Sequence, residues 1–178
     1  MKYAGIGSRE TTPRILAQME QLAERLAKAR WTLRTGGADG ADTAFENGHH
    51  AGAGTQNLEV YLPWNGYNGR QRCEEHGTIV LDAAVGKQAE AIAGKLHPAW
   101  HRCRRGARAL HARNVAIIQG RNLDDDVDAV VCWTRDGEAT GGTGMGIRIA
   151  RERDIPVFNL FRPHGGDVHA ALETMAHS

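Results

Sequence analysis

The sequence predicts an α/β fold with a doubly wound, mainly parallel sheet and helices on both faces. Short apolar runs alternate along the chain with segments of helical periodicity, an order that favours parallel strands joined by helices. Glycine-rich turns follow three of the apolar runs, which is typical of tight strand-to-helix connections. Because crossovers between parallel strands are right-handed, this alternation indicates a Rossmann-like open sheet. The chain of 178 residues fits a single domain, 1–178.

The first predicted strand, residues 3–6, is a short apolar run that ends beside a glycine. Thr12 and Pro13 then indicate the start of a helix, since threonine is a favoured N-cap and proline suits the first helical position. The helix is predicted to continue to about residue 26 because its apolar residues fall on one face. These residues are Ile15, Leu16, Met19, Leu22, Ala23 and Leu26.

A second strand and a second helix are predicted at residues 31–35 and 41–50. The turn between them reads Gly-Gly-Ala-Asp-Gly, and we expect the carboxylate of Asp39 to cap the helix. Asp42 lies in the first helical turn, where a negative charge interacts favourably with the helix dipole. A third strand at residues 58–62 ends at a proline, which cannot continue the hydrogen-bonding ladder.

The middle of the chain has weaker patterns. Residues 65–77 are polar and rich in glycine and asparagine, which indicates a loop. A short strand is expected at residues 78–81, followed by helices at 87–95 and 100–118. The second of these helices is locally basic. Its arginines are Arg102, Arg104, Arg105, Arg108 and Arg113.

The last part of the chain repeats the strand-then-helix order. A buried strand is predicted at residues 128–133, because every residue after Asp128 in this segment is apolar. A loop at 134–142 and a helix at 143–153 follow. The final strand is expected at 155–160 and a terminal helix at 167–176.

Composition and charge limit the function classes. The 22 Lys and Arg residues against 21 Asp and Glu leave a formal charge of +1, so no overall positive field attracts nucleic acid or a membrane surface. The chain starts without an apolar signal core and has no run of about 18 apolar residues, so we expect a cytoplasmic protein. The 3 cysteines form no C-x-x-C pair and the 9 histidines no ligand motif, so neither disulfides nor a metal or other cofactor is expected.

Three glycine-rich segments share one expected position, at the carboxyl end of a strand and just before a helix. In open α/β sheets these ends line one crevice where ligands bind, and the N–H groups of the following helix favour an anion such as phosphate. In a single turn of this kind, the glycines are explained equally well by the tight bend of the backbone. Three such turns that converge on one crevice favour binding of a phosphorylated or ribosylated small molecule. The segments are Gly5-Ile6-Gly7-Ser8-Arg9, Gly36-Gly37-Ala38-Asp39-Gly40 and Thr140-Gly141-Gly142-Thr143-Gly144.

Further ligand contacts are expected from side chains around these segments. Ser8 and Arg9 suit a phosphate. Trp64 and Trp133 each end a strand, so their indoles either stack on a base at the mouth of the crevice or cover the edge of the core. Tyr67 and Asn68 lie in the loop beyond Trp64. The complete set of expected ligand-binding residues is Gly7, Ser8, Arg9, Gly36, Gly37, Ala38, Asp39, Trp64, Arg113, Asn114, Trp133, Gly141, Gly142, Thr143 and Gly144.

Four segments, residues 5–9, 35–42, 111–114 and 141–144, carry a resemblance to a known family. The chain resembles the SLOG superfamily, which includes the DNA-processing protein A family and the "lonely guy" phosphoribohydrolases, often misnamed lysine decarboxylases. The likeness spans roughly residues 3–160 and is nearest to small SLOG-type proteins of phages and mobile elements. It implies a nucleotide-binding domain that forms a homo-oligomer.

The phosphoribohydrolase branch implies cleavage of an N-glycosidic bond. That branch carries P-G-G-x-G-T-x-x-E and an upstream arginine, whose counterpart here is Arg113. Thr140 stands in place of its proline, Met145 of its threonine and Arg148 of its catalytic glutamate. Because an oxocarbenium-like transition state needs an acidic side chain, Arg148 opposes this chemistry. A carboxylate for this chemistry could instead come from another loop, and the candidates are Asp39, Asp42 and Glu46. The alternative roles are a helix cap for Asp39 and a solvated helix residue for Glu46.

The DNA-processing branch implies binding of single-stranded DNA without catalysis. Such binding uses basic residues along the phosphate backbone and aromatic side chains for stacking. The basic helix at 100–118 has His97, His101 and His111 around it, but aromatic residues make up only 6% of the chain. A run of charge on a helix is most often a solvated face, so nucleic acid is the less favoured partner.

The sequence therefore favours binding of a nucleotide-derived small molecule at the carboxyl edge of the sheet, as in sensing or sequestering a nucleotide signal. An N-glycosidic or phosphoribosyl hydrolase and a single-stranded DNA-binding protein are the alternatives. The residues do not identify the ligand, and they leave open whether the protein catalyses a reaction.

Overall fold

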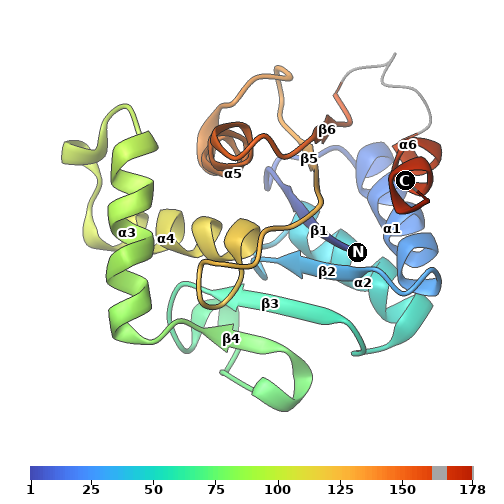
Figure 1. The fold of residues 1–178 in the computed structure, drawn as a ribbon, viewed down its shortest axis with the longest axis horizontal. Coiled ribbons are helices and arrows are strands. Elements are labelled where there is room, and N and C mark those ends of the chain that lie inside the picture. Colours follow the sequence, from blue (N-terminus) through green and yellow to red (C-terminus); the bar gives the residue numbers. More distant parts are fainter. Residues whose placement is uncertain (162–167, 178) are drawn as a thin grey trace.

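The computed structural model describes residues 1–161 and 168–177, which form one parallel sheet of six strands in the order β4-β3-β2-β1-β5-β6 (Figure 1). All five pairings between neighbouring strands are parallel. The strands are β1 (Lys2–Gly7), β2 (Thr32–Thr35), β3 (Leu58–Leu62), β4 (Thr78–Val80), β5 (Ala129–Trp133) and β6 (Val157–Asn159).

Helices cover both faces of the sheet, with α1, α2 and α6 on one side and α3, α4 and α5 on the other (Figure 1). This arrangement confirms the predicted doubly wound α/β fold. Among the described residues, none of the helices combines the length and the apolarity needed to cross a membrane. The helices are α1 (Pro13–Lys28), α2 (Ala41–Ala53), α3 (Ala83–Leu96), α4 (Arg105–Gln119), α5 (Gly141–Glu152) and α6 (Val168–Ala176).

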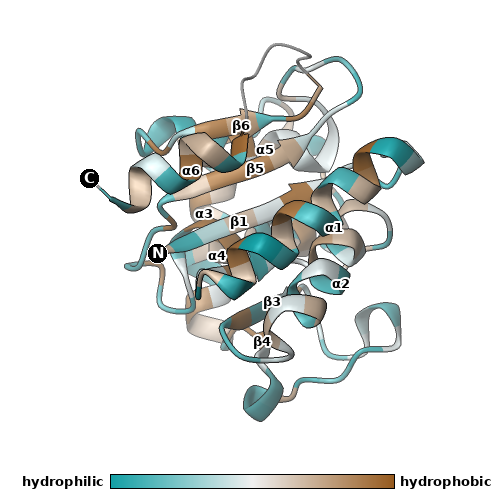
Figure 2. Cartoon of the chain, turned by 90° about the vertical axis from the view of Figure 1, so that its right-hand side faces the viewer, coloured by the Kyte–Doolittle hydropathy of each residue, from teal (hydrophilic) through white to brown (hydrophobic). Residues whose placement is uncertain are grey.

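Alternate residues of the central strands build two separate cores. Tyr3 and Val131 pack with the helices of the α1–α2 face, whereas their neighbours Ala4 and Val130 pack with those of the α4–α5 face. Both faces are therefore buried, and the central strands are hydrophobic along their length while the outer side of α1 is hydrophilic (Figure 2).

The order of the strands places a crevice at the end of β1. From β1 the chain runs outward through β2, β3 and β4, and it then returns through α3 and α4 to β5 on the other side of β1. The register pairs Gly7 with Trp133, so the carboxyl ends of β1 and β5 lie side by side. In open α/β sheets ligands bind at such a switch point, because the two connections leave it in opposite directions.

The helix expected at residues 100–118 is divided in two. A 3-10 turn, η3 (Trp100–Arg102), is separated from α4 by Cys103 and Arg104, whose ψ angles of 123° and 163° are those of extended backbone. The carbonyl of Cys103 accepts a hydrogen bond of 3.0 Å from Nε of Arg108. The extended backbone at these two residues interrupts a pattern that reads as one continuous helix.

Several other boundaries also differ from the sequence-based expectations. α3 begins at Ala83 and α5 at Gly141, so the end of the expected loop at 134–142 is helical. Glycines and alanines at a helix start carry no apolar periodicity, which is why the pattern misses them. The strand expected at 155–160 is reduced to β6, and residue 167 of the expected terminal helix lies outside the described residues.

The expected loop at 65–77 contains two 3-10 turns, η1 (Tyr67–Gly69) and η2 (Glu74–His76). Near its end Cys73 pairs with Thr78 in an isolated antiparallel bridge. The loop is therefore held at both turns, and η1 contributes to the site described below.

Candidate functional site

A cleft of about 560 Å³ opens at the carboxyl ends of β1 and β5. Its volume falls in the range of roughly 300–1,000 Å³ that is common for small-molecule sites. Its walls come from the turn after β1, the β2–α2 turn, η1, one face of α4, and the stretch from the end of β5 to the first turn of α5. The lining residues are Ile6, Gly7, Ser8, Arg9, Glu10, Ala38, Asp42, Tyr67, Ala107, Leu110, His111, Arg113, Asn114, Thr134, Arg135, Asp136, Thr140, Gly141, Gly142 and Thr143.

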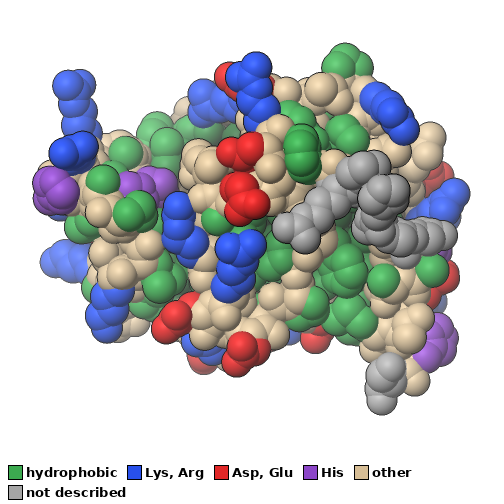
Figure 3. All heavy atoms as spheres, turned by 90° about the horizontal axis from the view of Figure 1, so that it is seen from above, with side chains coloured by type: hydrophobic (Ala, Val, Ile, Leu, Met, Phe, Trp, Pro, Cys, Tyr) green, Lys and Arg blue, Asp and Glu red, His purple; other side chains and the backbone are tan. Residues whose placement is uncertain are grey.

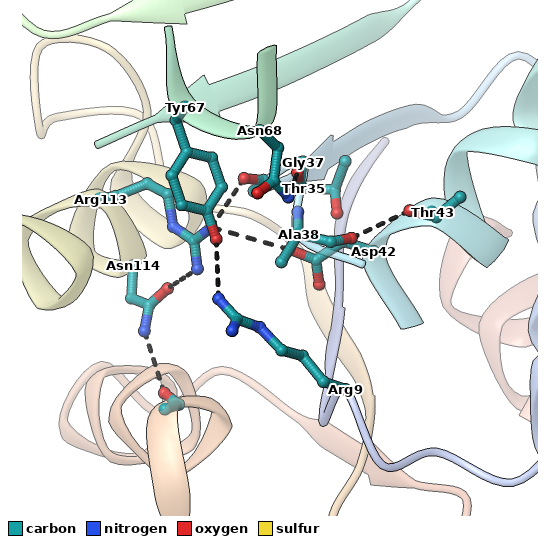
Figure 4. A network of polar contacts seen from close by, with 12 residues as sticks. Arg9, Thr35, Gly37, Ala38, Asp42, Thr43, Tyr67, Asn68, Arg113 and Asn114 are labelled. Carbon is teal, nitrogen blue, oxygen red and sulfur yellow. Dashed lines mark hydrogen bonds and ion pairs between the residues drawn. The ribbon is translucent and has the colours of Figure 1, made fainter. Parts of the chain in front are cut away.

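Arg113 extends from α4 across the β2–α2 turn (Figure 4). Its Nη1 donates a hydrogen bond of 2.6 Å to the carbonyl of Gly36, and its Nη2 donates one of 3.0 Å to Oδ1 of Asn114. A Cβ atom at Gly36 would lie 2.3 Å from Nη1, so this position of the guanidinium requires glycine there. Nε of Arg113 is buried without a hydrogen-bond partner among the described residues.

Tyr67 contacts both Arg113 and a second guanidinium group, that of Arg9. Its hydroxyl accepts a hydrogen bond of 3.2 Å from Nη2 of Arg9, and Cζ of Arg113 lies 5.9 Å from the centroid of its ring. The neighbouring Asn68 donates to the carbonyl of Gly37 at 3.1 Å, which holds η1 over the β2–α2 turn. Arg9 and Arg113 therefore approach Tyr67 from opposite walls (Figure 4).

Asp42 is the buried carboxyl group of the cleft. Its Oδ2 lies 3.9 Å from Nη1 of Arg113 and accepts the N–H of Ala38 at 3.2 Å. Burial raises the pKa of Asp42 to about 6, although Arg113 and the Ala38 N–H both stabilise the ionised form. A carboxyl group with such a pKa exchanges a proton near neutral pH, which is a property of functional sites.

The structure corrects the expected cap of α2. The N-cap is Gly40, so among the described residues no N-cap side chain bonds to the helix, and Asp39 is exposed and does not line the cleft. Asp42 instead reaches back to the Ala38 N–H, so the carboxylate that stabilises this turn lies within the helix. The prediction that Asp39 caps α2 is therefore wrong, because the N-cap position belongs to Gly40, one residue further along the chain.

The first turn of α5 opens into the cleft at Gly141 and Gly142. Among the described residues no side chain caps this helix, while Nδ2 of Asn114 donates to the carbonyl of Gly142 at 2.9 Å and ties the turn to α4. A Cβ atom at either glycine would meet nothing within 4 Å. The N–H groups of a first helical turn lack intrahelical partners, so this end of α5 suits an anion.

Two turns on the rim are held by their own side chains. Oγ of Ser8 accepts the N–H of Glu10 at 3.0 Å, and the carbonyl of Ser8 accepts the hydroxyl of Thr11 at 2.6 Å. On the facing rim, Oδ1 of Asp136 accepts the hydroxyl of Thr140 at 3.0 Å. The Ser8 hydroxyl thus stabilises its own turn in this structure.

Arg148, which replaces the glutamate of the phosphoribohydrolase motif, does not line the cleft. Its Nη2 donates to the carbonyl of Ala139 at 2.7 Å, so it supports the loop before α5. Gly144 serves the same packing, because a Cβ atom there would lie 2.4 Å from the Ala139 backbone. The guanidinium of Arg148, whose charge would oppose hydrolase chemistry, therefore binds the backbone of Ala139 and does not line the cleft.

His111 lies on the α4 wall of the cleft and contacts a second histidine. The centroids of the His111 and His97 rings are 4.5 Å apart. Burial, together with the nearby His97 and two arginines, lowers the pKa of His111 to about 4, so the imidazole is neutral at pH 7. Within the described residues, the group of three side chains that could hold a metal ion is His97, Cys103 and His111.

The structure brings 9 of the 15 expected ligand-binding residues onto the cleft. Of the expected catalytic carboxylates it places only Asp42 there. Gly36 and Gly37 lie beneath the lining and position Arg113 and Asn68. The expected residues that line the cleft are Gly7, Ser8, Arg9, Ala38, Arg113, Asn114, Gly141, Gly142 and Thr143.

Besides Asp39, three expected side chains lie away from the cleft. Trp64 is 43% exposed and packs edge-on against Tyr67, with ring centroids 5.3 Å apart. Trp133 is only 7% exposed and belongs to the core of the α1–α2 face. Glu46 is buried and accepts a hydrogen bond of 2.6 Å from Nη1 of Arg70, so it is not a solvated helix residue.

His111, Leu110 and Ala107 line the cleft although the sequence did not single them out as ligand contacts. They precede Arg113 and Asn114 at helical spacing. Residues three and four apart share one face of a helix, so the face that carries the expected Asn114 also predicts Ala107, Leu110 and His111. The rim residues after β5 carried no comparable signal.

Comparison with solved structures finds DNA processing protein A from Helicobacter pylori, described for its unique single-stranded DNA binding mode. The two chains are 15% identical with a TM-score of 0.52, and the match covers 100% of this chain and 74% of that chain. At this identity the likeness shows the fold alone. Comparison with protein-family models finds no matching family, and comparison with curated proteins finds no relative.

Proposed function

We propose that the cleft binds a nucleotide-derived small molecule, with its phosphate at the first turn of α5 between Arg9 and Arg113. The observation that carries this proposal is the convergence of two guanidinium groups and an uncapped helix start on one open volume. Each of these features favours an anion, and together they suit the negative charge of a phosphate group.

The remaining walls suit the uncharged part of a nucleotide. Leu110 and Ala107 form an apolar side on α4, and the side chain of Tyr67 also lines the cleft. The open space beside Gly141 and Gly142 lets a ligand approach the backbone closely. Near neutral pH, partial protonation of Asp42 reduces its repulsion of an anion in the same cleft.

The test compares AMP with adenosine by calorimetry and thermal shift, with GMP, a cyclic nucleotide and ADP-ribose as further probes. A ligand at 100 times its Kd stabilises the folded state by about 2.7 kcal/mol, which raises Tm by roughly 5–10 °C for a chain of this size. We expect AMP to bind at least about 10-fold more tightly than adenosine because charge-assisted hydrogen bonds contribute roughly 1.5–3 kcal/mol.

Arg9→Ala provides the matched variant, since Arg9 is exposed and its loss leaves the core intact. Its AMP affinity is expected to fall about 10-fold while adenosine affinity is unchanged. Arg14→Ala, an exposed arginine on α1, is the control and should bind AMP like the unaltered protein. Equal binding of AMP and adenosine, or no binding of any probe at millimolar concentration, would contradict the proposal.

Binding of single-stranded DNA is the second candidate, favoured by the structural likeness to a protein described as binding it. Lys and Arg side chains gather, with histidines among them, at the end of the molecule formed by α3, η3 and α4 (Figure 3). Arg102, Arg104 and Arg105 are exposed there. If this end binds DNA, Arg104→Glu with Arg105→Glu weakens binding of a labelled oligothymidylate and leaves AMP binding intact.

Salt dependence decides whether such DNA binding uses phosphate contacts. Anisotropy with the oligothymidylate at low and high salt should then show affinity that falls steeply, because each neutralised phosphate releases counterions. A flat salt dependence, or equal affinity of the double variant, would count against this second candidate.

One feature favours the hydrolase alternative, namely Asp42 on the cleft wall beside Arg113. An acid with a pKa of about 6 is suited to protonating a leaving base. Incubation with AMP, followed by chromatography for free adenine, tests this chemistry. Asp42→Asn should abolish any release and Asp39→Asn, exposed and off the cleft, should not; the same release from both variants would exclude Asp42 as the acid.

A further inference from the structure

We propose that His97, Cys103 and His111 form a binding site for a thiophilic divalent metal ion, zinc being the expected one. Their ligand atoms all lie within 4.8 Å of one another. Sγ of Cys103 is 3.8 Å from Nδ1 and 3.9 Å from Nε2 of His97. The spacing of the histidines along the sequence predicts no metal, so only the folded chain reveals this group.

Three segments bring the ligands together. His97 follows the last residue of α3, Cys103 lies in the extended break between η3 and α4, and His111 lies two turns into α4. The ring of Trp100 packs 6.1 Å from each histidine ring, centroid to centroid, and so holds the rings near each other. The break at Cys103, which the helical pattern does not predict, is what turns the thiol toward the histidines.

The separation between Cys103 and His97 is close to that of neighbouring ligands in a tetrahedral site, and all three ligand atoms lie within 4.8 Å of one another. Zinc–sulfur bonds of about 2.3 Å and zinc–nitrogen bonds of about 2.0–2.1 Å place neighbouring ligand atoms roughly 3.3–3.7 Å apart. Sγ of Cys103 and Nδ1 of His97 are 3.8 Å apart. Side-chain rotations that move these atoms by a few tenths of an ångström therefore bring them to the separation that a tetrahedral zinc ion needs. No backbone rearrangement is needed for that pair.

The donor atoms favour a soft metal over magnesium or calcium. One thiolate and two imidazoles are the ligand types that select zinc, whereas magnesium and calcium take oxygen ligands. Metal binding requires the thiol of Cys103 to lose its proton to solvent, and the resulting thiolate offsets the positive charges of Arg113 and Arg148 near His111. Sγ of Cys103 also lies 3.7 Å from the carbonyl oxygen of Ala99.

An unpartnered nitrogen supports the assignment independently of the distances. Nδ1 of His111 is buried and has no hydrogen-bond partner among the described residues. Buried polar atoms usually have a partner, so an exception calls for an ion or a water. Nδ1 of His97, in contrast, accepts the N–H of Ala99 at 3.1 Å, and a metal would either replace that hydrogen bond or bind through Nε2.

The site would have three protein ligands among the described residues, which leaves a fourth position for water or a ligand group. His111 lines the cleft, so the metal would lie at the edge of the proposed nucleotide site. The two proposals rest on different residues. The metal site stands if no nucleotide binds, and the nucleotide site stands if no metal binds.

The chain offers its own control. Cys73 and His76 also form a cysteine–histidine pair, with Sγ 3.2 Å from Nδ1, but among the described residues they belong to no group of three metal-binding side chains. A real site at His97, Cys103 and His111 therefore depends on Cys103 and not on Cys73. Adventitious binding to surface pairs would depend on Cys73 at least as strongly, since the Cys73–His76 pair is the closer one.

The experiment adds Co²⁺ as a spectroscopic probe and Zn²⁺ as its competitor to the full chain, freed of metal with a chelator. We expect one equivalent of Co²⁺ to produce a thiolate-to-metal charge-transfer band and the strong visible bands of tetrahedral cobalt, and Zn²⁺ to displace them. Cys103→Ser and His97→Gln should each weaken Zn²⁺ binding by at least about 100-fold, whereas Cys73→Ser should retain it.

The variants are checked for folding by circular dichroism and Tm, and His97→Gln serves as the second variant if Cys103→Ser does not fold. A charge-transfer band that survives Cys103→Ser, or that disappears in Cys73→Ser, would overturn the assignment. So would the absence of any such band in the unaltered protein at one equivalent of Co²⁺.

Discussion

Two polar clusters at opposite ends of the sheet differ in how completely their charges are paired. At the amino side Arg34 of β2 is 2% exposed, and its three nitrogens all have partners. At the carboxyl side Arg113 also lies mostly buried, but its Nε has no hydrogen-bond partner in the part of the chain that the structure describes. Asp42, its carboxylate neighbour, is 3.9 Å away, longer than a hydrogen bond.

The amino-side cluster is closed by direct contacts. Nε of Arg34 donates to Glu59 at 2.8 Å and Nη2 to Asp125 at 2.6 Å, while the hydroxyl of Tyr61 donates to Glu59 at 2.6 Å. Lys2 adds a further ion pair with Asp125. This cluster joins β1, β2, β3 and the segment before β5.

The difference separates charges that stabilise the fold from charges that remain available. Burying a charge is costly unless its hydrogen-bonding capacity is met, so a closed cluster is expected to contribute to stability only. Protein groups offset the cost of burying the Arg113 charge only in part, and Arg113 lines an open cleft. An anionic ligand would complete the pairing there.

The largest expected effect is the loss of stability on breaking the closed cluster. Arg34→Met leaves Glu59 and Asp125 without their common partner, and we expect the free energy of unfolding to fall by about 3 kcal/mol, or Tm by roughly 6–12 °C. Urea unfolding followed by circular dichroism measures it.

Lys28→Met is the matched control for this change, since it removes an exposed ion pair with Glu24 on α1. Its expected effect is below about 0.5 kcal/mol. If Arg34→Met were no more destabilising than Lys28→Met, the contrast between closed and open clusters would fail.

A similar magnitude is expected from the titration of Asp42, but with a pH dependence. Folding raises its pKa from 3.8 to about 6, so the native state binds the proton more strongly and the contribution to stability decreases as pH rises from about 4 to about 6. The decrease amounts to about 3 kcal/mol. Asp42→Asn removes this titration, so the variant should gain stability relative to the unaltered protein across that interval.

Urea unfolding of both proteins at several pH values between about 4 and 7.5 gives the difference directly. A difference that does not change with pH would show that the pKa of Asp42 is not raised in the folded protein.

A smaller effect on stability and a larger one on binding are expected from Arg113→Met. We expect unfolding to change by about 1 kcal/mol, because the guanidinium loses two hydrogen bonds but a buried, incompletely paired charge is also removed. AMP affinity should fall about 10- to 100-fold, as measured by calorimetry. A stability loss equal to that of Arg34→Met, with AMP affinity unchanged, would assign Arg113 to the fold instead.

The smallest effect is expected at Trp64. Because this side chain is 43% exposed and does not line the cleft, Trp64→Ala should change stability by less than about 0.5 kcal/mol and AMP affinity by less than about 2-fold. Tryptophan stacking on a base would instead cost roughly 1–3 kcal/mol of binding. A loss of that size, seen by calorimetry, would bring Trp64 into the site.

The fold was predictable because its signals are local. The alternation of apolar strands with helical periodicity needs only neighbouring residues, and it placed every strand within a few residues of its position. Glycine segments at strand ends predicted which edge carries the cleft, since parallel strands present all their carboxyl ends together. The boundaries missed, at Cys103 and Gly141, are those where packing or glycine breaks the pattern.

The composition of the site was only partly predictable. Arg9, Arg113 and Gly142 followed from their segments, but Trp133 turned into the core because its position in β5 faces α1 and α2. Glu46 paired with Arg70 from a loop 24 residues away, which no local pattern reveals.

By itself the sequence determined the order of strands and helices, the two buried faces and the edge of the sheet at which the cleft lies, because periodicity and glycine placement act within a few residues. Only the tertiary structure decided which charges are paired, which carboxyl group lies in the cleft, and that His97, Cys103 and His111 meet. Those outcomes depend on how far each crossover brings one side chain toward another, and long-range packing sets that distance.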